Sequence, residues 1–192
     1  MSVSAIVLAG GRSSRFGRDK LVEPIGGLPM LWRTIEAVRH VAVDVVVVSA
    51  PGATTALPPD VREVHDAVPG EGPLVGVIAG LRAVRHDAVL IVGGDMPWVQ
   101  DDVLRLMLAS MGPGQAAVAL ESDGRRQQLP IAVARGPALA AGRRLVDAGE
   151  RRFGALLEAL DAVALAEGRW RISDPAGDSL RDVDQVDDLP RA

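Results

Sequence analysis

Short apolar runs alternate along this chain with segments in which apolar residues recur every three or four positions. The apolar runs predict strands at 5–8, 43–48, 61–64, 89–92, 115–120, 130–134 and 163–165. The recurring positions predict helices at 28–41, 74–84, 100–111, 137–148 and 153–160, and a short helix around 186–189. Strands that alternate with amphipathic helices predict an α/β fold of three layers, in which helices cover both faces of a mostly parallel central sheet.

A stripe of glycines marks the helix predicted at 74–84. Gly72, Gly76 and Gly80 recur every four residues. This spacing indicates either close packing of the helix against a strand or room for a flat ligand, and the sequence favours neither.

The first predicted strand leads directly into a glycine-rich, basic loop. Gly10 and Gly11 follow the strand, and Lys20 ends the loop; between them lie Arg12, Ser13, Ser14, Arg15, Gly17 and Arg18. Glycines let the backbone approach an anion and direct several N–H groups at it, and the cations neutralise its charge. The pattern is typical of a phosphate-binding loop, although its spacing fits neither the P-loop nor the dinucleotide-binding fingerprint.

Composition narrows the class of protein further. With 192 residues, of which 48% are apolar, the chain is long enough for one domain with a sizeable core, and we expect a single domain over 1–192. The net charge of −4 gives no overall attraction to nucleic acid or a membrane surface. The sequence has no cysteine, no signal peptide pattern and no apolar stretch long enough to span a membrane, so we expect a cytoplasmic protein.

Polar or glycine residues follow each of the first four predicted strands. Gly10, Ser49, Asp66 and Asp95 occupy these positions. In open α/β sheets, ligands bind beyond the carboxyl ends of the strands. The sequence therefore predicts that these four residues meet at one rim and form a single site.

Asp95 is the strongest candidate for a metal ligand at that rim. It follows Gly93 and Gly94 and precedes Pro97, which predicts an exposed carboxylate. Nucleoside triphosphates react as complexes with Mg²⁺, which takes one or two carboxylates together with phosphate oxygens and water. The alternative is that Asp95 only caps a helix or stabilises a turn.

Four motifs together carry a resemblance to a known family. Residues 8–20 read L-A-G-G-R-S-S-R-F-G-R-D-K, residues 72–76 read G-P-L-V-G, residues 95–97 read D-M-P and residues 149–152 read G-E-R-R. These resemble the motifs of nucleotidyltransferases with a Rossmann-like fold, and most closely those of the molybdenum cofactor guanylyltransferases. The likeness runs from residue 5 to about residue 160.

The resemblance implies that GMP passes from GTP to molybdopterin with release of pyrophosphate, in a reaction that needs Mg²⁺. It implies that Arg15 and Lys20 hold the triphosphate and that Asp95 holds the metal. In such a reaction, positioning and charge stabilisation carry most of the rate. It also implies a monomer that works with other proteins of cofactor biosynthesis and with molybdoenzyme chaperones.

The resemblance assigns the remaining site residues as well. The backbone of Leu8, Ala9, Gly10 and Gly11 would contact the nucleotide. Ser49 and Asp66 occupy the positions at which the family contacts the nucleoside. Arg151 and Arg152 would bind the phosphate of the pterin acceptor, since arginine binds phosphate bidentately; a surface ion-pair turn is the alternative.

Two departures from the family pattern keep other functions open. Ser49 replaces an asparagine, and Asp182-Val183-Asp184 stands where the family has N-x-N. Asp184 would then be a second metal ligand beside Asp95. The alternatives are a nucleotidyltransferase that uses CTP or another nucleotide, acting on molybdopterin or on a sugar or alditol phosphate, and a nucleotide-binding regulator without turnover.

Overall fold

A mixed, mostly parallel sheet forms the centre of the molecule. The computed structural model describes residues 2–10, 19–52, 56–65, 72–183, 185 and 188. The strands of the large sheet are β1 (Val3–Ala9), β4 (Asp44–Ser49), β5 (Arg62–His65), β6 (Ala88–Gly93), β7 (Ala117–Ser122), β8 (Arg125–Ala134) and β9 (Val163–Leu165). Their order is β5-β4-β1-β6-β8-β7-β9. Only β8 runs antiparallel to its neighbours, β6 and β7.

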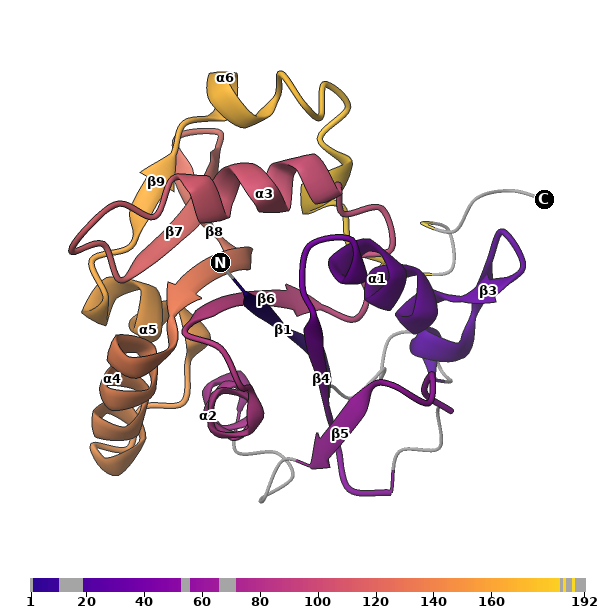
Figure 1. Ribbon diagram of the computed structural model, residues 1–192, viewed down its shortest axis with the longest axis horizontal. Helices are drawn as coiled ribbons and strands as arrows, with labels where there is room; N and C mark the ends of the chain where they lie inside the picture. The colour runs from indigo at the N-terminus through magenta and orange to yellow at the C-terminus, as the bar shows by residue number, and fades with distance from the viewer. Residues whose placement is uncertain are drawn as a thin grey trace.

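Helices cover both faces of this sheet (Figure 1). The helices are α1 (Met30–Arg39), α2 (Pro73–Ala83), α3 (Asp101–Ala109), α4 (Arg135–Asp147), α5 (Phe153–Ala159) and α6 (Glu167–Trp170). Two short 3₁₀ helices, η1 (Lys20–Val22) and η2 (Asp178–Leu180), and a small hairpin of β2 (Pro24–Ile25) and β3 (Leu28–Pro29) complete the described elements. The predicted three-layer α/β architecture is confirmed.

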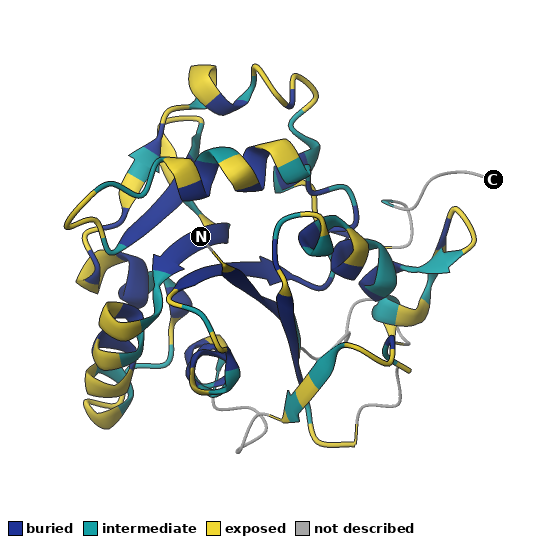
Figure 2. Cartoon of the chain, viewed as in Figure 1, coloured by how far each residue is buried: buried dark blue, intermediate teal, exposed yellow. Residues whose placement is uncertain are grey.

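The sheet separates two hydrophobic clusters. On one face, apolar side chains of α1 and α3 and the indole of Trp170 pack against the strands. On the other face, side chains of α2, α4 and α5 do so. The central strands are buried on both sides, while the outer helix faces are exposed (Figure 2). This burial explains why those strands appear in the sequence as continuous apolar runs rather than as alternating patterns.

The predicted elements differ from the observed ones mainly at their ends. The helix predicted at 28–41 begins only at Met30, because Leu28 and Pro29 form β3 and pair with β2. The strand predicted at 130–134 begins at Arg125, because the hairpin with β7 continues to the Asp123-Gly124 turn. The helix predicted around 186–189 falls on residues of which only 188 is described.

The surroundings of Gly80 favour close helix–strand packing, rather than room for a flat ligand, as the reason for glycine at this position of the stripe. A Cβ atom there would lie 2.7 Å from Ile6 Cγ2 and 3.1 Å from Val48 Cγ2. The residue therefore lets α2 pack closely against β1 and β4, and no ligand is needed to explain it.

A buried charge network fixes the edge of the sheet at which β1 and β4 begin. The carboxylate of Asp44 accepts hydrogen bonds from Ser4 Oγ (2.7 Å), Arg62 Nη2 (2.5 Å) and the Arg85 N–H (2.9 Å). Arg62 also donates to the carbonyl of Ala83, the last residue of α2. This cation at the end of α2 also offsets the negative end of the helix dipole.

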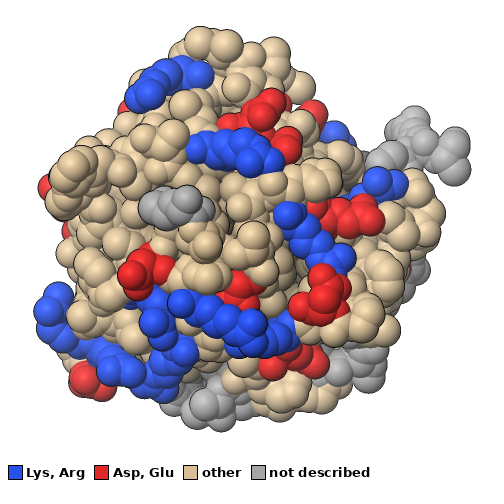
Figure 3. Space-filling view, in the orientation of Figure 1, with Lys and Arg blue, Asp and Glu red and all other residues tan. Residues whose placement is uncertain are grey.

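Basic side chains gather along the lower part of the face shown in Figure 3, over the region of α2, α4 and β5.

We expect Asp44→Asn to lower the free energy of unfolding by about 1–3 kcal/mol at pH 7, because it leaves buried donors with a weaker partner. Burial raises the pKa of Asp44, but the hydrogen bonds from Arg62, Ser4 and Arg85 outweigh it and hold the pKa below its ordinary 3.8. The ionised carboxylate therefore stabilises the fold above pH 3.8, and this contribution is lost as the pH falls through the lower, folded-state pKa.

Urea unfolding at pH 7 and at pH 3 measures this effect. The difference between wild type and Asp44→Asn should shrink at the lower pH. The matched control is Asp60→Asn, at an exposed ion pair with Arg39, which should change stability by less than about 1 kcal/mol. An equal loss for Asp44→Asn at both pH values would contradict the role given to its charge.

Candidate active site

The carboxyl ends of β5, β4, β1 and β6 lie side by side, as the sequence predicts. Ala9 pairs with Ser49, Ser49 pairs with His65, and Leu8 pairs with Gly93. Gly10 directly follows β1, and Asp95 lies two residues beyond the end of β6, at this rim. Four of the predicted site residues, Gly11, Arg15, Asp66 and Asp184, lie outside the described residues.

Two glycines and a threonine shape the turn that presents Asp95. The Gly94 N–H donates to the carbonyl of Leu8 at 2.9 Å, and the hydroxyl of Thr34 on α1 donates to the Gly94 carbonyl at 3.1 Å. A Cβ atom on Gly93 would lie only 2.5 Å from Asp95 Oδ1. Glycine at 93 therefore allows the carboxylate of Asp95 to fold back over the end of β6.

Lys20 lies against Asp95 at the centre of the rim. Its ammonium donates to Asp95 Oδ2 at 2.8 Å and to the carbonyl of Val183 at 2.7 Å. The two side chains are 16% and 27% exposed, so the ion pair is half-buried. Asp19 places Lys20 by capping η1, since its carboxylate accepts from the Leu21 N–H at 3.0 Å.

Asp95 presents its carboxylate at the rim, where it pairs with Lys20. It does not cap α3, whose N-cap residue is Gln100. Its carboxylate is held next to a lysine, at a rim to which a nucleotide would bring phosphate oxygens, and that donor set is one that Mg²⁺ accepts. Within the described ranges no group of three or more His, Cys, Asp or Glu side chains forms a metal cluster.

Ser49 has partners that the sequence did not predict. Its side chain is buried, and its hydroxyl donates to Glu63 Oε1 at 2.5 Å and lies 3.0 Å from His65 Nδ1. Since Glu63 and His65 belong to the neighbouring strand β5, this contact joins the two strand ends. The role of Ser49 in contacting a nucleoside stays a prediction.

The motifs at 72–76 and 149–152 meet in the structure. The N–H of Leu74, in the first turn of α2, donates to the Arg151 carbonyl at 3.3 Å. Arg151 also donates through Nη1 to the carbonyls of Val146 and Glu150. The two motifs therefore form one corner of the rim, next to the start of α2.

Arg152 forms the ion-pair turn that the sequence left as an alternative. Its guanidinium donates to Glu150 Oε2 at 2.7 Å and is 72% exposed. The side-chain hydrogen bond from Arg152, aided by the N–H groups of Arg152 and Arg151, lowers the pKa of Glu150 to about 2. An anion that binds Arg152 would compete with this carboxylate.

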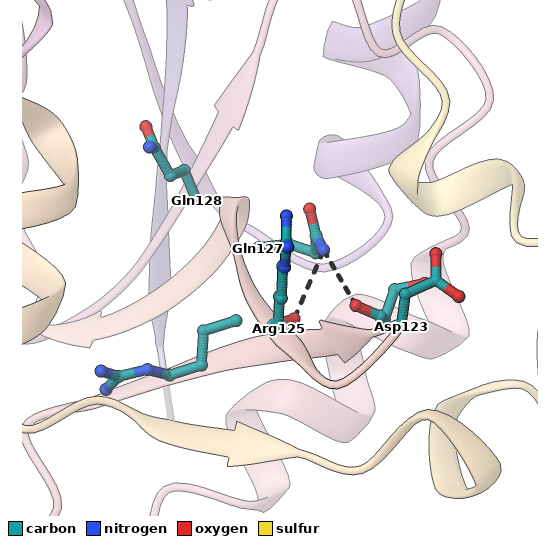
Figure 4. A pocket seen from close by; sticks show the side chains of 6 residues that line it. Asp123, Arg125, Gln127 and Gln128 are labelled. Carbon is teal, nitrogen blue, oxygen red and sulfur yellow. Dashed lines mark hydrogen bonds between the residues drawn. The ribbon is translucent and has the colours of Figure 1, made fainter.

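A hollow of about 460 Å³ lies at the β7–β8 turn, and the sequence gave no sign of it (Figure 4). It is lined by Ser122, Asp123, Arg125, Arg126, Gln127 and Gln128. Because β8 pairs antiparallel to β6 from Ala134 to Ile131, its earlier residues extend past the carboxyl end of β6. The hollow therefore lies at the same edge of the sheet as Asp95, and a Cβ atom at Gly154 of α5 would lie 3.4 Å from Gln128 Nε2.

Comparison with known proteins shows the family to which the chain belongs. The model of the family described as "MobA-like NTP transferase domain" matches residues 5–163. The chain belongs to this family. It is 35% identical to a probable molybdenum cofactor guanylyltransferase of Chloroflexus aggregans, over 98% of this chain and 92% of that protein. It is 28% identical to a molybdenum cofactor guanylyltransferase of Shewanella piezotolerans, over 80% of this chain and 76% of that one.

A solved structure of the same type supports the fold. A molybdopterin-guanine dinucleotide biosynthesis protein A from Archaeoglobus fulgidus superposes with a TM-score of 0.79 at 22% identity, covering 97% of this chain and 94% of its own. The family model and the curated relatives, rather than this superposition, identify the chain as a nucleotidyltransferase. In the described part of the chain, no helix is both long and apolar enough to cross a bilayer.

Two residues that shape the site, Thr34 and Val183, were missed by sequence reasoning. Thr34 is a polar residue inside the apolar stripe of α1, between the buried residues Leu31, Ile35 and Val38. That position was a usable signal. Val183 acts through its backbone, and nothing in its residue type indicates such a contact.

Proposed function

We propose that this chain is a molybdenum cofactor guanylyltransferase, which transfers GMP from GTP to molybdopterin. An oxygen of the acceptor's phosphate attacks the α-phosphorus of GTP, the bond to the β-phosphate breaks, and pyrophosphate leaves. The product is a guanine dinucleotide. The observation that carries the proposal is the Lys20–Asp95 pair, 2.8 Å apart at the rim beside Gly10.

Each charge at the rim has a role in this reaction. Lys20, together with Arg15, would bind the β- and γ-phosphates and stabilise the charge that develops on pyrophosphate. Asp95, with Asp184 as the second proposed ligand, would hold Mg²⁺, which supplies positive charge to the phosphate oxygens. The nucleotide would lie along the backbone of residues 8–11, with Ser49 and Asp66 toward the nucleoside.

The acceptor would approach Asp95 from the side opposite the nucleotide. Exposed arginines are available there, Arg152 beside Glu150 and Arg125 in the hollow at the β7–β8 turn. A terminal phosphate on the pterin would replace Glu150 as the partner of Arg152. We further propose that the 192 residues act as one cytoplasmic domain and as a monomer.

Thermal unfolding with Mg²⁺ and each of GTP, CTP, ATP and UTP tests the nucleotide choice. A ligand at 100 times its Kd stabilises a protein by about 2.7 kcal/mol, which for this length raises Tm by about 5–11 °C. We expect this shift with GTP and much smaller shifts with the others. A larger shift with CTP would favour a cytidylyltransferase, and no shift with any nucleotide would contradict a nucleotide site at this rim.

A further inference from the structure

Lys20 is the only lysine of the chain. The sequence contains 21 lysine and arginine residues, and the other twenty are arginines. An ammonium is a compact point charge, whereas a guanidinium is a planar fork that needs more room. At position 20 the cation lies between two oxygens, Asp95 Oδ2 at 2.8 Å and the Val183 carbonyl at 2.7 Å. A single nitrogen, Lys20 Nζ, makes both contacts.

Val183 bonds to both members of the charged pair. Its carbonyl accepts from Lys20, and its N–H donates to the backbone carbonyl of Asp95 at 3.1 Å. Its side chain is completely buried in a small cluster with Ile25 and Met30. A single residue near the end of the chain thus fixes the distance between a side chain of the first loop and the turn after β6.

The chain that leads to Val183 is itself firmly attached. The carboxylate of Asp174 accepts from the N–H groups of Gly177, Asp178 and Ser179, the residues that begin η2. The Ser179 hydroxyl in turn accepts from the Gln100 N–H at 3.1 Å, just before α3. These hydrogen bonds attach the segment that leads to Val183 to the residue at the start of α3.

A second attachment lies next to the turn that carries Asp95. The guanidinium of Arg181 stacks on the Trp98 ring at 4.0 Å from its centre. Since Trp98 is three residues beyond Asp95, this contact holds the segment beside the turn that carries the carboxylate.

We propose that Val183 is a positioning residue of the transfer reaction. Its buried side chain anchors residues 181–183, and its backbone N–H and carbonyl hold Asp95 and Lys20 in one arrangement. When a triphosphate enters, Lys20 exchanges Asp95 for phosphate oxygens while Val183 keeps the ammonium in reach. The inference rests on the proposed function for its catalytic consequence, but not for the contacts themselves.

The test compares Val183→Ala with Val183→Ile and with Val84→Ala. Val84 is 2% exposed and follows α2 at the opposite end of the sheet from Asp95, so its truncation matches the loss of buried side chain without touching the site. Acetic anhydride labelling without nucleotide or metal reports on Lys20, with the N-terminal amine as internal standard, because the chain has no other lysine.

In Val183→Ala we expect the relative acetylation rate of Lys20 to rise at least about threefold, because the local structure opens more often. We expect kcat to fall about tenfold while KM for GTP changes less than about threefold, since misplaced groups lose mainly transition-state stabilisation. In Val183→Ile both the acetylation rate of Lys20 and kcat should stay close to the wild-type values, and Val84→Ala should change neither quantity. Arg181→Ala, on the exposed surface, should raise the acetylation rate of Lys20 and lower kcat, each by less than Val183→Ala does.

Equal acetylation of Lys20 in Val183→Ala and Val84→Ala would overturn the inference, whatever the activity. If Val183→Ala does not fold, the Arg181→Ala variant decides in the same way. If the wild type transfers no GMP, the proposed function fails, and the labelling comparison still shows whether Val183 holds Lys20.

Discussion

Asp95→Asn is expected to reduce GMP transfer by about 10³-fold or more while the protein stays folded. The amide keeps the shape of the side chain but removes the negative charge that would hold Mg²⁺ and that now pairs with Lys20. A metal ion at the reacting phosphate stabilises the transition state by several kcal/mol, and about 1.4 kcal/mol corresponds to a factor of ten in rate. Steady-state kinetics with GTP, acceptor and a series of Mg²⁺ concentrations measure the loss.

Asp102→Asn is the matched control. Asp102 lies in the first turn of α3, seven residues further along, and is exposed. Its substitution should leave kcat within about twofold, as expected for a surface residue away from special features. If Asp95→Asn kept more than a tenth of the wild-type activity, the metal role of Asp95 would be wrong.

Lys20→Arg should lower kcat/KM for GTP by about 10²-fold even though the positive charge remains. The ammonium lies between Asp95 Oδ2 and the Val183 carbonyl, and a planar guanidinium does not reproduce these contacts. Lys20→Ala, which also removes the charge, should have a larger effect, about 10³-fold. Calorimetry should show weaker binding of GTP but not of guanosine, because Lys20 is expected to contact phosphate only.

The control for the arginine substitution is the reverse change at an exposed site, Arg82→Lys, near the end of α2. Its activity should equal that of wild type. Equal losses of GTP and guanosine affinity in Lys20→Ala would show that Lys20 does not act on the phosphates. The double variant Lys20→Ala/Asp95→Asn should lose less activity than the product of the two single losses, since Lys20 and Asp95 are in contact.

Much of this fold could be predicted because its signals are local. A buried parallel strand appears as a continuous apolar run, and a glycine turn follows where the chain leaves the sheet, as at Gly10 and Gly94. Since parallel strands end at one edge, the positions of Ser49 and Asp95 at one rim followed from the pattern alone. The structure confirms both placements.

The contacts within the site could not be predicted in the same way. Lys20 meets Asp95 across 75 positions of sequence and Val183 across 163, and neither spacing leaves a periodic signal. The D-V-D motif indicates Asp182 and Asp184 as candidate site residues, whereas the hydrogen bonds to Lys20 and to the Asp95 backbone described above come from Val183 between them. Ser49 likewise has its hydroxyl engaged by Glu63 and His65 of a neighbouring strand, whose register no local pattern specifies.

The transfer reaction itself tests the central claim most directly. Purified protein, Mg²⁺ and molybdopterin would be incubated with each of the four nucleoside triphosphates, and the dinucleotide product and pyrophosphate would be quantified together. We predict equal amounts of guanine dinucleotide and pyrophosphate with GTP, and little product with CTP, ATP or UTP. Pyrophosphate release without a dinucleotide, or a dinucleotide formed preferentially from another nucleotide, would contradict the proposed function.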